Sequence, residues 1–179
     1  MLIDGENIDT TLGQSVLGRK PEPTERPRWE RVMEFARQQW GQPVKALFFL
    51  NASGGTVPYS FVQALVSFGY TVLPVAGAAG EKVVDMAIVK TMQALISRAG
   101  DVLLLSHDVD FVPGMRALQD GHRRLGLVAF AEFVSGGFAE LIAGGLTVFD
   151  LEDDAQAFNT RLNRIRIIPI QDFDPTRYL

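Results

Sequence analysis

Short apolar runs alternate with stretches of helical spacing along most of this 179-residue chain, and this alternation limits the fold more than any other feature. Apolar runs bounded by polar or turn residues predict buried strands, whereas apolar residues three and four positions apart predict amphipathic helices. The expected strands are 1–3, 44–50, 70–75, 101–106, 123–130 and 146–149, and the expected helices are 28–40, 57–68, 83–98, 111–120 and 134–143. This order predicts an α/β fold, a three-layer sandwich with a central, mostly parallel sheet, helices on both faces and right-handed crossovers.

The alternation ends near Asp150, which indicates where the main domain ends. A chain of this length with 47% hydrophobic residues can bury one good core, so one domain is the default. After Asp150 come an acidic patch, three arginines and a short apolar run. We therefore expect one domain over 1–150 and a C-terminal extension over 151–179 that is not an independent domain.

Cysteine and histidine content limits the kind of metal site that the chain can build. There is no cysteine, which excludes disulfides and thiolate ligands, and the two histidines leave little material for a zinc site. A bound metal would be held by oxygen, as Mg²⁺ and Mn²⁺ prefer. No apolar run approaches the length of a membrane span and the start lacks a signal-peptide pattern, so we expect a soluble, cytoplasmic protein with no membrane partner.

The net charge of −4 argues mildly against a protein that coats nucleic acid through bulk electrostatics. It does not exclude a nuclease, because acids gathered in one metal site lower the net charge and bound cations partly reverse the local field. A nuclease would then need a local basic strip. Residues 10–28 carry Arg19, Lys20, Arg26 and Arg28 in a glycine- and proline-rich stretch that predicts a long loop.

Three acidic motifs stand where an expected strand or loop meets a helix. They are Asp4-Gly5-Glu6-Asn7, Lys82-Val83-Val84-Asp85 and Ser106-His107-Asp108-Val109-Asp110-Phe111. In open α/β sheets ligands bind in the crevice at the carboxyl ends of the strands. If the fold brings the motifs together there, their carboxylates form a cluster whose repulsion must be relieved by a cation or a proton. The sequence thus points to divalent-ion chemistry on a phosphate.

Each acid also has an ordinary structural explanation. Asp108 or Asp110 could cap the helix 111–120, and Asp85 could favour the positive end of its own helix. Asp4 could be a turn former ahead of Gly5. Independent caps need not converge on one crevice, so convergence of the three motifs would favour the metal interpretation.

Taken together and in this order, the three motifs resemble the NYN domain, a branch of the PIN-like ribonuclease superfamily, over about residues 1–150. The resemblance implies a Rossmann-like PIN fold and a metal-dependent endoribonuclease that hydrolyses RNA phosphodiester bonds in RNA processing or decay. By position it implies that Mg²⁺ or Mn²⁺ is bound by four catalytic acids, with Asn7 supporting the cluster and Ser106 near it. The four acids are Asp4, Asp85, Asp108 and Asp110.

Two positions depart from the pattern of many relatives, which have glycine where this chain has Val83 and His107. The imidazole of His107 could contact phosphate or modulate a proton transfer, or it could simply pack or face solvent. Lys82 could contact the scissile phosphate or an acid of the cluster, or remain a solvated residue ahead of its helix.

Basic residues outside these motifs could contact RNA. Those that follow the first motif could line the RNA entrance or form a solvated loop; they are Arg19, Lys20, Arg26, Arg28 and Arg31. Trp29 and Trp40 stand at helical spacing and fit a core better than a base-stacking platform. The arginines of the extension, Arg161, Arg164 and Arg166, could bind RNA phosphate, flank an edge strand or pair with a neighbouring subunit in a homo-oligomer.

Two other functions compete with the nuclease. A catalytically silent PIN-like scaffold could bind RNA or protein, although such a module would gain nothing from a crowded anionic cluster. A metal-dependent phosphatase or nucleotide hydrolase could use a similar sheet. Against the hydrolase, the chain has no Gly-x-x-x-x-Gly-Lys-Ser/Thr loop and no Asp-x-Asp at the end of the first strand.

Overall fold

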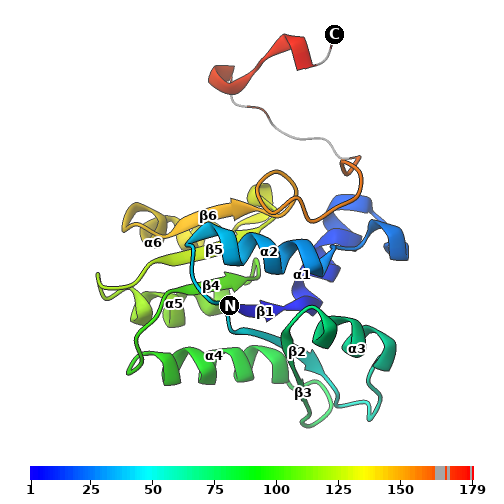
Figure 1. Cartoon of the computed structure of the whole chain (residues 1–179), viewed down its shortest axis with the longest axis vertical. Helices are drawn as coiled ribbons and strands as arrows, with labels where there is room; N and C mark the ends of the chain where they lie inside the picture. The colour runs from blue at the N-terminus through cyan, green and yellow to red at the C-terminus, as the bar shows by residue number, and fades with distance from the viewer. Residues whose placement is uncertain (164–167, 169, 178) are drawn as a thin grey trace.

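The computed structural model describes residues 1–163, 168, 170–177 and 179, and it contains one six-stranded sheet in the order β3-β2-β1-β4-β5-β6 (Figure 1). The strands are β1 (Leu2–Asp4), β2 (Ala46–Asn51), β3 (Tyr70–Val75), β4 (Val102–Leu105), β5 (Leu125–Ala129) and β6 (Thr147–Asp150). Every neighbouring pair is parallel. The α/β fold with a parallel central sheet is therefore confirmed.

The α-helices cover both faces of the sheet. They are α1 (Gly5–Thr11), α2 (Trp29–Gln39), α3 (Tyr59–Ser67), α4 (Val83–Leu95), α5 (Val112–Leu118) and α6 (Ala139–Ala143). Residues of α1, α2 and α3 share one hydrophobic cluster with the sheet, whereas α4, α5 and α6 share a second. Successive strand residues point to opposite clusters, as Phe48 and Phe49 of β2 do. This packing forms the expected three layers.

Short turns of tighter or wider helix connect these elements. A π-helical turn spans Leu12–Leu17, and 3₁₀ turns span Pro23–Glu25, Val109–Phe111, Ala131–Phe133, Gly136–Phe138, Ile170–Asp172 and Pro175–Arg177. None of the helices in the part of the chain just described is long and apolar enough to cross a membrane.

Aromatic packing around Phe48 fixes the end of β1 that carries the first acidic motif. The Phe48 ring meets Trp29 edge-on at 4.8 Å and Tyr70 at 5.8 Å between centroids. A Cβ atom on Gly5 would lie only 2.5 Å from the same ring, so a larger residue there would force the ring or the start of α1 to shift. Trp29 is 7% exposed and belongs to the core, as its spacing predicted.

The largest difference from the sequence-based expectation lies in residues 10–28, where half of the expected loop is helical. α1 continues into the π-helical turn, and Ile8, Leu12 and Val16, four residues apart, face the core. Gly18, with φ of 66°, ends this helical stretch. The glycine- and proline-rich composition correctly describes only the part after Leu17.

The expected helix over 134–143 is also wrong in its first half. Gly136 and Gly137 stand in a 3₁₀ turn, and the α-helix begins only at Ala139. Consecutive glycines disfavour an α-helix because of their conformational entropy. The other expected elements are present with boundaries that differ by a few residues.

The first part of the extension packs onto the sheet. Leu151, Ala155, Ala157, Phe158 and Leu162 are buried in the cluster that also holds α2. The Phe158 ring stacks on Phe130 at 5.8 Å. Arg161 lies 3.6 Å from Asp153, whereas Arg164 and Arg166 fall outside the described residues.

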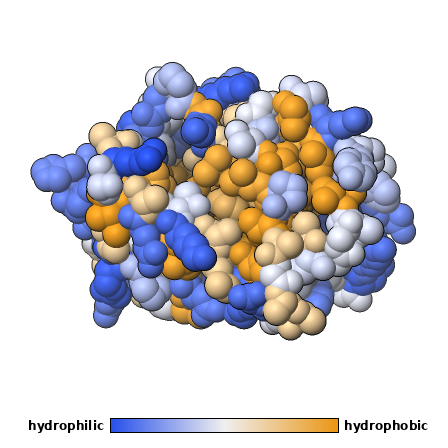
Figure 2. Space-filling view, turned by 90° about the horizontal axis from the view of Figure 1, so that it is seen from below, coloured by the Kyte–Doolittle hydropathy of each residue, from blue (hydrophilic) through white to orange (hydrophobic). Residues whose placement is uncertain are grey.

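The other edge of the sheet is formed by β3, which has Pro74 within it. Proline cannot donate a hydrogen bond and is characteristic of edge strands. Figure 2 looks at the molecule from this side and shows hydrophobic residues gathered across the middle of the face.

Candidate metal centre

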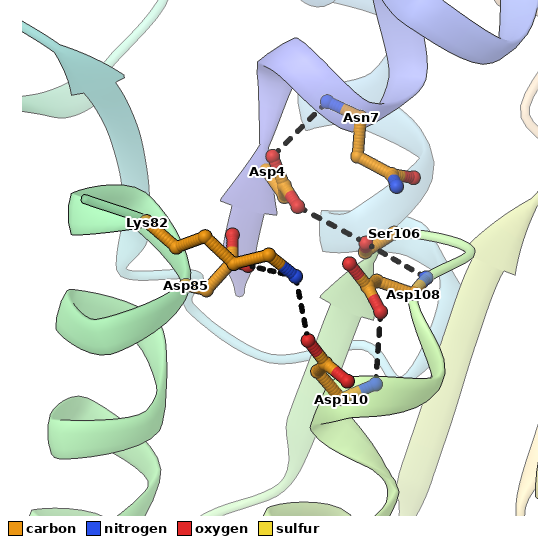
Figure 3. A network of polar contacts seen from close by, with 7 residues as sticks. All are labelled: Asp4, Asn7, Lys82, Asp85, Ser106, Asp108 and Asp110. Atoms are coloured by element: carbon orange, nitrogen blue, oxygen red, sulfur yellow. Dashed lines mark hydrogen bonds and ion pairs between the residues drawn. The ribbon is translucent and has the colours of Figure 1, made fainter. Parts of the chain in front are cut away.

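Three acidic side chains from two separate parts of the chain meet beside the carboxyl end of β4 (Figure 3). Asp85 lies in the first turn of α4, and Asp108 and Asp110 follow β4. Each offers an oxygen atom, and the three atoms lie within 4.8 Å of one another. We call these three residues the acidic cluster. Its donor set of carboxylate oxygens matches the ligands that Mg²⁺ and Mn²⁺ prefer, so the cluster could hold a divalent metal.

Asp4 lies next to the acidic cluster but is more deeply buried, with 3% of its surface exposed. Its Oδ1 accepts a hydrogen bond from the Asn7 backbone N–H at 3.1 Å, and its Oδ2 accepts one from Ser106 Oγ at 3.2 Å. Ser106 Oγ in turn accepts the Asp108 backbone N–H at 3.2 Å. Ser106 thus links the buried acid to the acidic cluster.

The environment of Asp4 disfavours its charge. Burial raises the pKa of Asp4 to about 6, the hydrogen bond from the Asn7 N–H opposes this rise, and the negative charge of Asp85 adds to it. A nearby cation would favour the ionised carboxylate.

Lys82 supplies a cation from the chain itself. Its Nζ lies 2.7 Å from Asp110 Oδ2 and 3.4 Å from Asp85 Oδ2, although its side chain is 65% exposed. Hydrogen bonds to Asp110 and Asp85 raise the pKa of Lys82 above its usual range. Of the alternatives left open by the sequence, the structure places this lysine in contact with the acids.

His107 is packed inside the protein and holds Asn7 in place. Its Nε2 accepts the Phe130 backbone N–H at 2.8 Å, so the ring proton resides on Nδ1, which lies 3.0 Å from Asn7 Oδ1. The His107 backbone N–H donates to the same Asn7 oxygen at 2.8 Å, and the ring stacks on Phe130 at 5.6 Å. Burial lowers the pKa of His107 to about 4, against the charge of Asp150, which raises it. This geometry favours a packing role over proton transfer.

A family model for the NYN domain matches residues 1–143. The chain belongs to the NYN domain family. The family is generally one of nucleases, and the match agrees with the order of the three acidic motifs on a PIN-like fold.

A solved structure supports the fold of this NYN domain. The crystal structure of a protein of unknown function from Vibrio parahaemolyticus aligns with a TM-score of 0.65 over 86% of this chain and 91% of that one. The two sequences are 19% identical, so the likeness concerns the fold alone. A search of curated proteins gave no match.

Capping and clustering occur together in this NYN domain. Asp108 caps the 3₁₀ turn Val109–Phe111 by accepting the Asp110 N–H at 2.9 Å, and Asp4 caps α1 through the Asn7 N–H. A carboxylate has two oxygens, so one can cap while the other faces the cluster. The two explanations offered by the sequence are therefore compatible.

The basic residues after α1 largely pair with other parts of the protein. Arg19 contacts both carboxylate oxygens of Glu25 at 2.7 and 2.6 Å. Arg26 lies 3.5 Å from Asp9, and Arg28 Nε donates to Asn159 Oδ1 at 3.1 Å. Arg31 donates hydrogen bonds to the backbone carbonyls of Gln156 and Phe158 and to the side-chain Oδ1 of Asn159. Lys20 is exposed, and together with Arg19 it lines a pocket on the surface.

Sequence reasoning missed Asp150, a buried acid at the end of β6. Its carboxylate accepts the backbone N–H groups of Glu152 at 2.7 Å, Asp153 at 2.9 Å and Ala131 at 3.0 Å. These bonds satisfy the carboxylate and anchor the start of the extension. The rule that singled out the other strand-end acids could have found it.

Proposed function

We propose that this NYN domain is a metal-dependent endoribonuclease that hydrolyses RNA phosphodiester bonds. The observation that carries the proposal is the convergence of Asp85, Asp108 and Asp110 within 4.8 Å, beside the buried Asp4. Carboxylates gathered this closely repel one another unless a cation is present. Oxygen donors and the family match both favour Mg²⁺ or Mn²⁺. We further propose that the catalytic domain comprises residues 1–150.

Asp85, Asp108 and Asp110 would hold the ion, and Asp4 would complete its negative surroundings. When bound, a divalent ion supplies an activated water and stabilises the charge that develops on the phosphate oxygens. Burial raises the pKa of Asp4 to about 6, and this positive charge close by would favour its ionised form.

The chain's own residues orient these groups. Ser106 Oγ donates to Asp4 and accepts from the Asp108 N–H, so one hydroxyl fixes the relative position of two acids. Asn7 holds Asp4 through its backbone and is itself held by His107. Each support is positioned by packing and keeps its acid in one geometry.

We assign to Lys82 the contact with the scissile phosphate. Its side chain is 65% exposed and ends at the acidic cluster, where the phosphate must approach. When the acids engage another cation, the ammonium group is released to pair with a phosphate oxygen. The basic segment of Arg19, Lys20, Arg26 and Arg28 would contact the RNA backbone more remotely.

The experiment that tests the proposal is cleavage of internally labelled RNA, single-stranded and structured, in Mn²⁺, Mg²⁺ or EDTA. We expect cleavage in metal alone, its loss in Asp108→Asn, and its retention in Asp153→Asn, which removes an exposed acid of the extension. Cleavage by Asp108→Asn at the wild-type rate, or in EDTA, would show the assignment to be wrong. RNA binding without cleavage under every condition would favour the scaffold instead.

A further inference from the structure

A deep apolar pocket opens beside α1, on the face of the sheet opposite the acidic cluster. Its volume is about 520 Å³, within the range of small-molecule sites in proteins. Aromatic side chains from three separate elements contribute to its wall, namely Trp29 of α2, Phe48 of β2, and Phe61 with Phe68 at α3. The pocket thus offers a flat-walled apolar space larger than a packing defect.

Both signs of charge stand among the residues that line the same pocket. Glu6, Asp9 and Glu30 bring carboxylates, whereas Arg26 and Arg28 bring guanidinium groups. A nucleotide presents the complementary set, because its base has N–H donors and an apolar ring and its phosphate has anionic oxygens. Arg26 already lies 3.5 Å from Asp9, and Arg28 donates to Asn159 Oδ1, so the phosphate of a bound nucleotide would compete with these partners for the two guanidinium groups.

The position of the pocket connects it to the candidate metal centre. Gly5 and Glu6 line it, and they directly follow Asp4. Glu6 Oε1 also accepts the Asn51 backbone N–H at 3.3 Å, which joins α1 to the end of β2. A strand that crosses the carboxyl ends of β1 and β2 would pass from one site to the other.

We propose that this pocket binds one unpaired base of an RNA whose backbone is held at the acidic cluster. The inference rests on the proposed function for the identity of its ligand. It makes the enzyme selective for single-stranded RNA, because a base in a duplex is stacked and paired and cannot enter.

The test uses the full chain and the fluorescence of Trp29, in a background where Trp40→Phe removes the other of its two tryptophans. The probes are a single-stranded RNA decamer of mixed sequence and a decamer of the same backbone that lacks bases, each titrated in EDTA and in Ca²⁺. We expect the RNA decamer to quench Trp29, and the abasic decamer to bind more weakly without quenching.

Two neighbouring substitutions on α3 separate the pocket from the rest of the surface. Ala64 lines the pocket, whereas Gln63 is exposed outside it. Ala64→Met should fill the space and weaken RNA binding roughly tenfold, the scale of one base-stacking contact, while Gln63→Met should leave affinity unchanged. If Ala64→Met is unstable, the comparison of the RNA and abasic decamers on the unchanged pocket still tests the inference.

The outcomes distinguish this inference from the proposed function. Cleavage of RNA combined with binding that is indifferent to Ala64→Met would overturn the pocket and leave the nuclease in place. If RNA binding depends on the pocket but the protein never cleaves RNA, the pocket would stand and the nuclease would be overturned. Absence of Trp29 quenching in both EDTA and Ca²⁺ would overturn the pocket, as would equal binding of the abasic decamer.

Discussion

Lys82 Nζ lies 2.7 Å from Asp110 Oδ2, and the same ammonium group is 3.4 Å from Asp85 Oδ2 (Figure 3). One flexible side chain thus pairs with two of the three carboxylates that we propose as metal ligands. A divalent ion and the lysine would compete for the same oxygens. The chain therefore carries an internal counter-ion that partly neutralises the acidic cluster in the absence of metal.

This competition predicts opposite effects of Lys82→Met on metal binding and on catalysis. Removal of the ammonium group should tighten Mn²⁺ binding about two- to fivefold, the worth of an exposed ion pair, because the metal no longer displaces it. Cleavage at saturating Mn²⁺ should fall, because the scissile phosphate loses its cationic partner. Isothermal titration calorimetry and initial rates measure the two effects.

Lys90→Met provides the control, since Lys90 is exposed on the same helix. It should change neither quantity. Unchanged Mn²⁺ affinity in Lys82→Met would mean that the observed ion pairs do not oppose metal binding.

The raised pKa of Asp4 should make the stability of the folded protein depend on pH in the absence of metal. Burial raises the pKa of Asp4 from 3.8 to about 6, so the folded state binds this proton more tightly than the unfolded state does. The stabilisation that results is complete below pH 3.8 and is lost as pH rises through about 6. Asp4→Asn should therefore be more stable than wild type at pH 8, by on the order of 2 kcal/mol, and nearly equal at pH 4.

Thermal unfolding in EDTA from pH 4 to pH 8 measures this difference. Addition of Mn²⁺ at pH 8 should stabilise wild type more than Asp4→Asn, because the metal binds the folded protein and compensates the ionised acid. A wild-type protein that is the more stable of the two at every pH would contradict the assignment of Asp4 as a strained, buried charge.

The acids of the candidate site could be located from the sequence because parallel strands end at one edge of a sheet. The apolar run ending at Ser106 and the short run ending at Asp4 already placed two motifs at that edge, and β1 and β4 are indeed neighbours. Asp85 could be predicted as well, because it lies in the first turn of a helix that starts at the same crevice. The alternating pattern therefore predicted the layers and the edge of the sheet at which the acids could meet.

Other features depend on partners that are distant in the sequence. The orientation of His107 depends on Asn7 and on the Phe130 N–H, which lie 100 and 23 residues away. The apolar pocket is assembled from segments between Gly5 and Phe68, and no local pattern describes it. The sequence did not predict α1 and the π-helical turn after it, because their apolar face is narrow and is formed mainly by Ile8, Leu12 and Val16.

His107 predicts a loss of stability without a change in proton transfer. His107→Ala should lose about 2–4 kcal/mol, because it creates a cavity and leaves the Phe130 N–H without its acceptor. The decrease of the cleavage rate toward low pH, corrected for the fraction of folded protein, should be the same as in wild type. Urea unfolding and a pH–rate profile measure the two quantities, and the exposed His122→Ala is the control.

Because the pKa of His107 is lowered on folding, the stability of the protein should also depend on pH through this residue. The pKa falls from 6.5 to about 4 on folding, so the neutral ring contributes its full stability above pH 6.5 and loses it as pH falls toward 4. Wild type should therefore lose stability over this interval faster than His107→Ala does. A parallel decline of the two proteins would contradict the lowered pKa of the buried His107 ring.

Gly5 predicts that packing on one face of the sheet controls the metal centre on the other. In Gly5→Ala the new methyl group would lie 2.5 Å from the Phe48 ring, so either the ring or the start of α1 must move. We expect a loss of about 1–3 kcal/mol in unfolding free energy. Because Asp4 and Asn7 flank the glycine and hydrogen-bond to each other, Mn²⁺ affinity should fall as well.

Gly54→Ala is the control, since nothing lies within 4 Å of a Cβ at that position. Reduced stability with unchanged Mn²⁺ affinity would show that the ring yields and that α1 keeps Asp4 in place.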